Sequence, residues 1–234
     1  KKTNGEVVSP GCFIPLAESS SLIGEISEVV LKNGLHQLAV WNEQGMNLSL
    51  SLNVSTFDLK DTQFPNRLKA LANKYEIEPE QVMLEVTESR IAENEQITIE
   101  VLTRLHMHGF RLAIDDFGTG YSSLSYLRKY PFNTLKIDRS FIHGIEEDSA
   151  NVKLVIATIA MAHSLGLKVV AEGVETEEQL NLLMEQKCEH AQGNFFSKAV
   201  SEEEMRQILT RTEERRVGKG GRTRGGRCKW RTKE

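Results

Sequence analysis

The chain has 234 residues and a formal net charge of −4, with 39% hydrophobic residues. This length suits one large domain or two small ones with an apolar core, and the acidic balance argues against a general nucleic-acid binder, so no DNA partner is expected. No apolar run approaches the roughly 18 residues that a membrane span needs, and no signal peptide is visible. The three cysteines share no metal-ligand spacing, which favours free thiols in a reducing cytosol.

The charge is unevenly distributed along the chain. Residues 211–234 contain ten Lys or Arg and three Glu, a net charge of +7, so the preceding 210 residues carry −11. With almost no apolar residue, the basic tail is expected to be disordered. A linker or a sequence-end artefact is the favoured interpretation of this tail, and an anion-binding tail is the alternative. An acidic body that handles an anionic substrate needs metal ions to offset its own charge.

The predicted elements begin with a loop over residues 1–16, because Asn4-Gly5 and Pro10-Gly11 are turn signals. Helical spacing of apolar residues then predicts a helix over 22–41, with Asn33-Gly34 as a candidate break. Strands are predicted at 47–54, 82–88, 111–115, 134–138, 168–172 and 188–192. Helices are predicted at 64–75, 95–107 and 152–165, and a short one just before Pro131. Two more begin at capping boxes: one runs from Thr176–Gln179 to Glu185, and the last starts at Ser201–Glu204.

This order is a βα unit repeated six times, which implies parallel strands with helical crossovers. A closed (β/α)₈ barrel needs about 250 residues. The sequence therefore predicts an α/β fold, a (β/α)₈ TIM-like barrel over residues 1–210 that lacks about its first two strands. Residues 211–234 form the separate tail. Because residue 1 is a Lys, we expect the chain to be an excerpt from something longer.

Polar residues mark the carboxyl ends of the predicted strands. Glu85 lies inside a strand otherwise built to be buried, and a buried carboxylate must be paired, hydrogen-bonded or bound to metal. A structural salt bridge would be a sufficient explanation for Glu85 alone. However, Asn53, Asp115, Lys136 and Glu172 each lie in, or at the carboxyl end of, a separate predicted strand. In a barrel those ends converge on one mouth, which is where α/β enzymes place their chemistry.

Hard oxygen ligands from several strands suit Mg²⁺ or Mn²⁺ rather than zinc. Two such ions about 3.5–4 Å apart can activate a water and stabilise the leaving oxygen in phosphodiester hydrolysis. In such a site Lys136 could orient the attacking water or neutralise phosphoryl charge, and Glu172 could accept a proton. From spacing alone, a binding barrel with structural charges is the alternative. His163 lies in an amphipathic helix and is expected to be packed or at the surface rather than a ligand.

Three segments of the chain are DDFGTGYSSL at 115–124, LKID at 135–138 and AEGVET at 171–176. These segments resemble the EAL-domain family, the cyclic di-GMP phosphodiesterases of bacterial signalling. Supporting matches are FIPLAE at 13–18, LEVTES at 84–89 and Gln192-Gly193. Together they cover about residues 5–210 in the expected order, and the first segment is highly specific.

The resemblance implies a (β/α)₈-like barrel with an antiparallel first strand. It also implies hydrolysis of cyclic di-GMP to linear pGpG, with two Mg²⁺ or Mn²⁺ ions in the intact site. By motif, the metal ligands would be Asn53, Glu85, Asp115 and Asp116. Lys136 would hold the water.

Further roles also follow from the resemblance. Glu172 would be the general base or a partner of the second metal. Glu88 would anchor the loop 116–122, which in the family takes part in dimer contacts, and Glu175 and Gln192 would line the same mouth. We therefore expect a homodimer and a parent protein with attached sensory or GGDEF-type domains. That parent would be cytoplasmic, or the cytoplasmic part of a membrane-tethered regulator, with no membrane contact from this segment.

Some features depart from the family pattern. The Glu-Ala-Leu motif should lie before Lys1, so the first two strands and one metal-binding glutamate are expected to be absent and the chain to be catalytically impaired. Asn194 stands where the family usually has Tyr, and Ala199 where Pro is common. Residues 54–58 differ from the commoner SARQ-like continuation, which puts substrate contacts there in question.

Two other functions remain alternatives to hydrolysis of cyclic di-GMP by this chain. One is a degenerate EAL domain that binds cyclic di-GMP, or a partner protein, without hydrolysis. The presence of Glu85, Asp115, Lys136 and Glu172 favours the enzyme over that reading. The other is an unrelated metal-dependent barrel hydrolase.

Overall fold

The computed structural model describes residues 8–20, 22–91, 95–119, 124–145 and 149–208. They belong to two compact units, which are described separately below. The first unit comprises Lys1–Lys136 and Leu165–Leu167, and the second comprises Ile137–Ser164 and Lys168–Glu234. The predicted tail, residues 211–234, lies outside the described residues, so its expected disorder stays a prediction.

The strands of the first unit follow one another in sequence order across the sheet. They are β1 (Leu50–Asn53), β2 (Val82–Thr87), β3 (Arg111–Phe117) and β4 (Thr134–Ile137), the last residue of which belongs to the second unit. β2 pairs in parallel with both β1 and β3. The first five residues of β2 are all buried, which is typical of a central strand in a parallel sheet covered on both faces.

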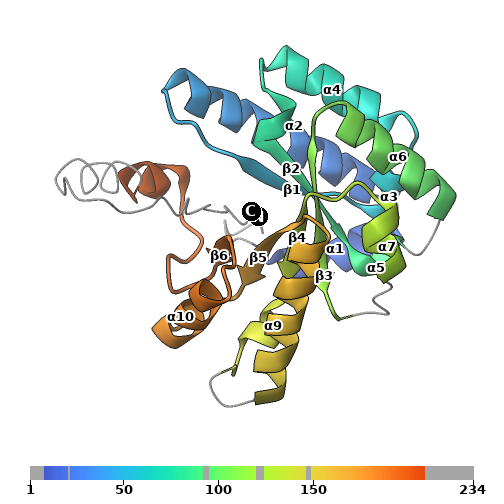
Figure 1. The fold of residues 1–234 in the computed structure, drawn as a ribbon. Helices are drawn as coiled ribbons and strands as arrows, with labels where there is room; N and C mark the ends of the chain where they lie inside the picture. The colour runs from blue at the N-terminus through green and yellow to red at the C-terminus, as the bar shows by residue number, and fades with distance from the viewer. Residues whose placement is uncertain (1–7, 21, 92–94, 120–123, 146–148, 209–234) are drawn as a thin grey trace. The chain divides into compact units, whose positions relative to one another are not determined.

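Helices alternate with these strands and cover them. They are α1 (Pro10–Ser19), α2 (Ile23–Glu43), α3 (Thr56–Lys60), α4 (Phe64–Lys74), the short 3₁₀ helix η1 (Pro79–Gln81), α5 (Glu88–Ile91), α6 (Glu95–Met107) and α7 (Leu124–Lys129). α2, α4 and α6 pack side by side, with α2 against β1 and α6 against β3 (Figure 1). Their inner faces supply fully buried leucines such as Leu35, Leu38 and Leu102, which form the core.

Two predictions for the N-terminal region were wrong. Residues 10–16 belong to helix α1 rather than to a loop, because Pro10 occupies the first helical position, where its fixed φ and missing N–H suit a helix start. The predicted break at Asn33-Gly34 is also absent, since α2 runs through it. A Cβ at Gly34 would lie 3.1 Å from Leu50 and 3.2 Å from Leu52, so this glycine lets α2 approach β1 closely.

The second unit repeats the same alternation. Its described strands β5 (Lys168–Glu172) and β6 (His190–Gln192) are parallel, and its helices are α8 (Arg139–Ile142), α9 (Ser149–Ser164) and α10 (Glu177–Glu185), with a helical segment at 202–208. Both predicted capping boxes are confirmed. One joins Thr176 to Gln179 at the start of α10, and the other joins Ser201 to Glu204.

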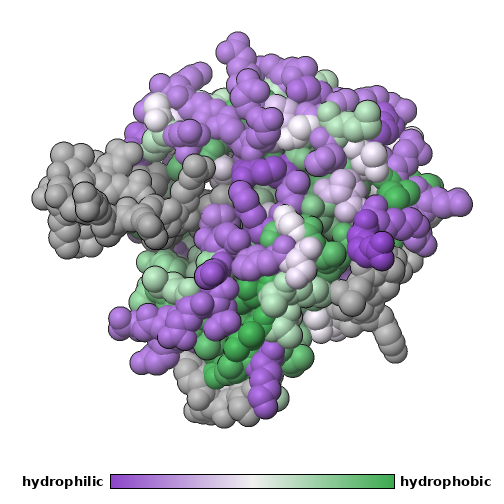
Figure 2. Space-filling model, in the orientation of Figure 1, coloured by the Kyte–Doolittle hydropathy of each residue, from purple (hydrophilic) through white to green (hydrophobic). Residues whose placement is uncertain are grey.

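The surface of the second unit is locally apolar. Figure 2 shows apolar residues gathered over α9, where Leu154 is 50% exposed. Cys12 and Cys188 are free thiols, as predicted, while Cys228 lies outside the described residues. Among the described helices, none has both the length and the apolar character required to cross a bilayer.

Candidate active site

Three charged side chains are buried together on three neighbouring strands of the first unit. Glu85 of β2 is 2% exposed, Asp115 of β3 is 6% exposed and Lys136 of β4 is 2% exposed. The Lys136 ammonium donates to Glu85 Oε2 at 3.0 Å and to Asp115 Oδ1 at 2.5 Å. The structure therefore brings together two predicted metal ligands and the predicted water-holding lysine, which we name the buried charge cluster.

The electrostatics of this cluster are unusual for a protein interior. Moving a charge out of water costs several kcal/mol, so buried charges persist only when paired and hydrogen-bonded. If all three groups are ionised, two negative charges face one positive charge. A carboxylate has about four lone-pair sites, so the bonds from Lys136 do not exhaust the acceptor capacity of Glu85 and Asp115. The surplus negative charge makes this a place where a further cation would be stabilised.

Asp116 reaches the cluster through an unusual backbone conformation. Successive residues of a strand point to opposite faces, so Asp115 and Asp116 would ordinarily diverge. Asp116 instead has a φ of 54°, in the left-handed region. One of its carboxylate oxygens lies within 4.8 Å of one from Asp115. Thr119 stabilises the turn, because its hydroxyl and its N–H both donate to the Asp116 carbonyl. Such a conformation costs about 1 kcal/mol in a residue other than glycine, and strained residues of this kind cluster at functional sites.

Asn53 is placed by strand register. It lies opposite Glu85 in the parallel pairing of β1 with β2 and therefore projects from the same face of the sheet. The next residue continues the ladder, since the Val54 N–H donates to the Glu85 carbonyl at 2.9 Å. Asn53 is exposed, unlike the three members of the buried charge cluster.

Glu88 follows β2 directly as the first residue of α5 and is 5% exposed. Its Oε2 accepts from the Gly118 N–H at 3.5 Å, so it contacts the loop that the sequence predicts it to anchor. The remainder of that loop, residues 120–122, lies outside the described residues. The anchoring role therefore stays a prediction with one supporting contact.

The remaining predicted site residues lie in the second unit. Glu172 ends β5 opposite Gln192 of β6. The Glu175 carboxylate accepts from the Asn194 side-chain amide at 3.4 Å, so the residue that replaces the family's usual tyrosine contacts a predicted site residue. Gly193 is sterically required there, because a Cβ would lie 2.1 Å from the Val174 carbonyl oxygen.

The donor set of the first unit fits a hard divalent cation. Asn53 offers an amide oxygen, and Glu85, Asp115 and Asp116 offer carboxylates. Mg²⁺ and Mn²⁺ prefer oxygen ligands of this kind, whereas structural zinc sites favour Cys and His. The chemistry of these side chains thus agrees with the predicted cofactor class.

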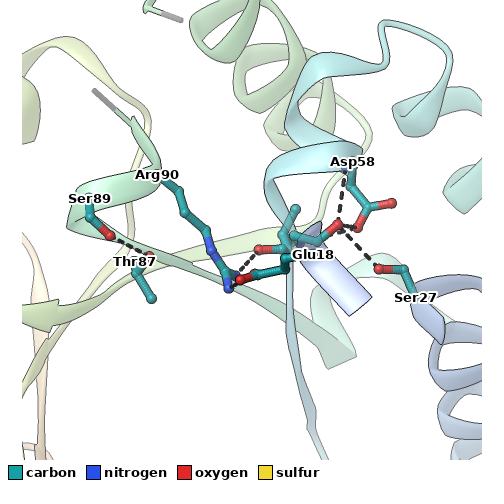
Figure 3. Close-up of polar contacts among 8 residues, drawn as sticks. Glu18, Ser27, Asp58, Thr87, Ser89 and Arg90 are labelled. Atoms are coloured by element: carbon teal, nitrogen blue, oxygen red, sulfur yellow. Dashed lines mark hydrogen bonds and ion pairs between the residues drawn. The ribbon is translucent and has the colours of Figure 1, made fainter. Parts of the chain in front are cut away.

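Sequence reasoning missed Arg90. This residue of α5 donates to the carbonyl of Val54, directly after Asn53 (Figure 3). No local pattern pointed to it, because the contact spans 36 residues of sequence.

The chain is similar to several known proteins. The family model of the EAL domain matches residues 1–199. The signaling protein YkoW of Bacillus subtilis is 39% identical over 206 residues, which is 88% of this chain and 26% of that protein. The cyclic di-GMP phosphodiesterase PA2567 of Pseudomonas aeruginosa is 37% identical over 204 residues, 87% of this chain and 35% of that protein. The chain thus spans between about a quarter and about a third of these relatives.

Solved structures show the same fold. A structure of the PaMucR phosphodiesterase in complex with c-di-GMP matches with a TM-score of 0.81 and 35% identity, covering 87% of this chain and 83% of that chain. Together with the parallel strands, this match confirms the predicted fold class, an α/β fold of the TIM-barrel-like type.

Proposed function

Because the chain belongs to the EAL domain family, we propose that it hydrolyses one phosphodiester bond of cyclic di-GMP to give linear pGpG, at a rate that is impaired relative to an intact domain of the family. Two relatives support this substrate. PA2567 is a cyclic di-GMP phosphodiesterase, and the PaMucR phosphodiesterase has been solved with c-di-GMP bound. The observation that carries the proposal is the buried charge cluster, since Glu85, Asp115 and Lys136 are buried charged side chains on three neighbouring strands of the sheet.

We assign Asn53, Glu85, Asp115 and Asp116 as the ligands of Mg²⁺ or Mn²⁺, with two ions in the active enzyme. When bound, these ions supply Lewis acidity at the phosphoryl group and lower the pKa of bound water. The support is the all-oxygen donor set and the short separation of the Asp115 and Asp116 oxygens.

In the proposed reaction, a water oxygen attacks phosphorus while the bond from phosphorus to the 3′ oxygen breaks. The attacking water loses its proton to a base, the role assigned to Glu172, and the departing 3′ oxygen becomes a hydroxyl by taking up a proton. Lys136 holds the water and offsets charge that develops on the phosphoryl oxygens. Its pairing with Glu85 and Asp115 keeps the ammonium in one position, so little reorganisation is needed during the reaction.

The other predicted residues have supporting roles. Glu88 anchors the loop after β3, consistent with its contact to Gly118. Glu175 and Gln192 line the substrate mouth. We further propose that the parent protein is cytoplasmic, acts as a homodimer and carries sensory or GGDEF-type domains. Light scattering of the parent protein tests the dimer.

The test is formation of pGpG from cyclic di-GMP with Mg²⁺ or Mn²⁺, separated by anion-exchange chromatography. We expect Asp115→Asn to lower the rate at least about 100-fold, because it removes a ligand charge from the cluster. Asp61→Asn is the matched control, since Asp61 pairs with Arg67 at the surface of the same unit. The rate of pGpG formation by that control should stay within about twofold of the rate of the unmutated chain. Measurable pGpG formation at equal rates by the unmutated chain and Asp115→Asn would contradict the proposal.

One observation favours the alternative, binding of cyclic di-GMP or a partner protein without hydrolysis. Lys136 already neutralises part of the charge on Glu85 and Asp115, so the cluster can be stable as a purely structural ion-pair group. Binding of cyclic di-GMP by the full-length parent protein, with no pGpG formed under any divalent ion, would establish this alternative. The expected impairment of the chain also stays a prediction, which a rate measured beside that of PA2567 tests.

A further inference from the structure

Arg90 joins three segments of the first unit that are distant in sequence. One guanidinium nitrogen, Nη1, donates to the Val54 carbonyl at 2.7 Å. The other, Nη2, donates to Glu18 Oε1 of α1 at 2.9 Å. Figure 3 shows the Arg90 side chain extending from α5 toward Glu18. Arg90 thus uses its planar fork to connect α1, the turn after β1 and the helical turn after β2.

Val54, the main-chain target of Arg90, is held from two sides. It is 1% exposed, and its N–H donates to the Glu85 carbonyl at 2.9 Å. A buried carbonyl needs a hydrogen-bond partner, and here a charged side chain provides it. Val54, the residue immediately after Asn53, is therefore fixed to β2 by its N–H and to α5 by its carbonyl.

The following residue is held by a buried capping box. The Ser55 hydroxyl accepts from the Asp58 N–H at 3.3 Å and donates to Asp58 Oδ2 at 2.5 Å, while the Ser55 N–H donates to the same oxygen at 3.1 Å. Ser27 of α2 donates to the Ser55 hydroxyl at 3.3 Å (Figure 3). This box starts α3 and fixes the direction in which the chain leaves Asn53.

The two contacts of Arg90 differ in how much they contribute to stability. Its ion pair with Glu18 joins side chains that are 21% and 38% exposed, and such pairs contribute about 0–1 kcal/mol. The hydrogen bond to the Val54 carbonyl is charge-assisted and its acceptor is buried. Removing a donor from a buried acceptor costs about 1–3 kcal/mol, which is more than the ion pair contributes. Arg90 therefore acts mainly on the turn, and Glu18 acts by orienting Arg90.

We infer that Arg90 is a positioning residue that holds the Asn53 amide in place for metal binding, with Glu18 as its orienting partner. The inference rests on the proposed function, in which Asn53 is a ligand. Asn53 itself is exposed and lies at the end of a strand, so packing alone does not fix it. Groups that orient ligands without touching the metal change metal affinity by about 10–100-fold when removed.

The test compares four variants of the chain for Mn²⁺ affinity and for amide hydrogen exchange in the absence of metal. Arg90→Met should raise the Mn²⁺ Kd at least about 10-fold and speed exchange of the Val54 N–H by a similar factor. Arg90→Lys should fall between the parent chain and Arg90→Met, since one ammonium cannot reproduce the fork. Glu18→Gln should raise the Kd only about two- to threefold. Arg67→Met, which removes an exposed arginine paired with Asp61, is the control and should change neither quantity.

The outcomes separate the inference from the proposed function. An unchanged Val54 exchange rate in Arg90→Met overturns the inference, as does faster exchange with an unchanged Mn²⁺ Kd. A fall in unfolding temperature alone, with both quantities unchanged, would make Arg90 merely structural and would also overturn it. Absence of Mn²⁺ binding by the parent chain would instead contradict the proposed function, and the exchange rate alone would still decide whether Arg90 holds the turn.

Discussion

The two units differ in how far their paired charged side chains are buried. In the first, Lys136 lies between two carboxylate side chains that are at most 9% exposed. In the second, His163 Nε2 pairs with Glu189 at 3.2 Å, and both side chains are about a third exposed. Water already solvates the second pair, so it costs little and contributes little. The first group bears a desolvation cost that apolar side chains of similar volume would avoid, which indicates a functional requirement.

The largest expected effect comes from removing the cation of the buried charge cluster. Lys136→Met leaves Glu85 and Asp115 buried without this partner and should destabilise the chain by about 3–5 kcal/mol. Lys129→Met is the matched control, since Lys129 pairs with Glu95 at the surface, and should cost less than about 1 kcal/mol. Urea unfolding of both variants measures the difference, and similar losses would show that burial does not distinguish the two lysines.

A smaller effect on stability is expected from glycine substitutions at two residues with a left-handed backbone, only one of which is a proposed metal ligand. Asp116 and Lys187 both have a left-handed backbone, with φ of 54° and 60°. Lys187 follows the end of α10, where glycine is favoured. Asp116→Gly and Lys187→Gly should each stabilise their unit by up to about 1 kcal/mol. Only Asp116→Gly should also weaken Mn²⁺ binding, measured by calorimetry. Loss of Mn²⁺ binding in both variants, or in neither, would argue against Asp116 as a ligand.

The smallest effect is the pH dependence of the exposed pair. Burial alone would raise the pKa of the Glu189 carboxyl, but hydrogen bonds from the main chain, including the Val169 N–H, and from His163 outweigh it and lower that pKa. Because folding favours the ionised form, the stabilisation is complete above the unfolded-state pKa of Glu189 and disappears as the pH falls through its lowered folded value. The stability difference between the parent chain and Glu189→Gln should therefore shrink toward low pH in urea unfolding. A difference that grows as the pH falls would contradict this sign.

The alternation of strands and helices could be predicted because strand and helix periods differ and because the buried strands are apolar. Helix α1 could not be predicted, because the dipeptide Pro10-Gly11 is compatible both with the start of a helix and with a turn. Gly34 was misleading for a similar reason, because its role is to admit Leu50 and Leu52 rather than to break α2.

For the candidate site, the sequence could predict which strands carry the charged residues. The predicted strand boundaries placed Glu85, Asp115 and Lys136 on separate strands, and the structure joins their side chains directly. The sequence could not give the left-handed turn at Asp116, which depends on the conformation of one residue. Nor could it give the contact of Arg90 with the Val54 carbonyl, which depends on where α5 packs against β2 and β3.

The most direct test of the central claim, that the buried charge cluster exists for catalysis, is the rate of pGpG formation by Glu85→Gln. This substitution keeps the shape of a side chain that is 2% exposed and removes only its charge. We expect the rate to fall at least about 100-fold relative to the parent chain while cyclic di-GMP still binds. A rate within about twofold of the parent chain would show that the cluster is structural and would contradict the claim.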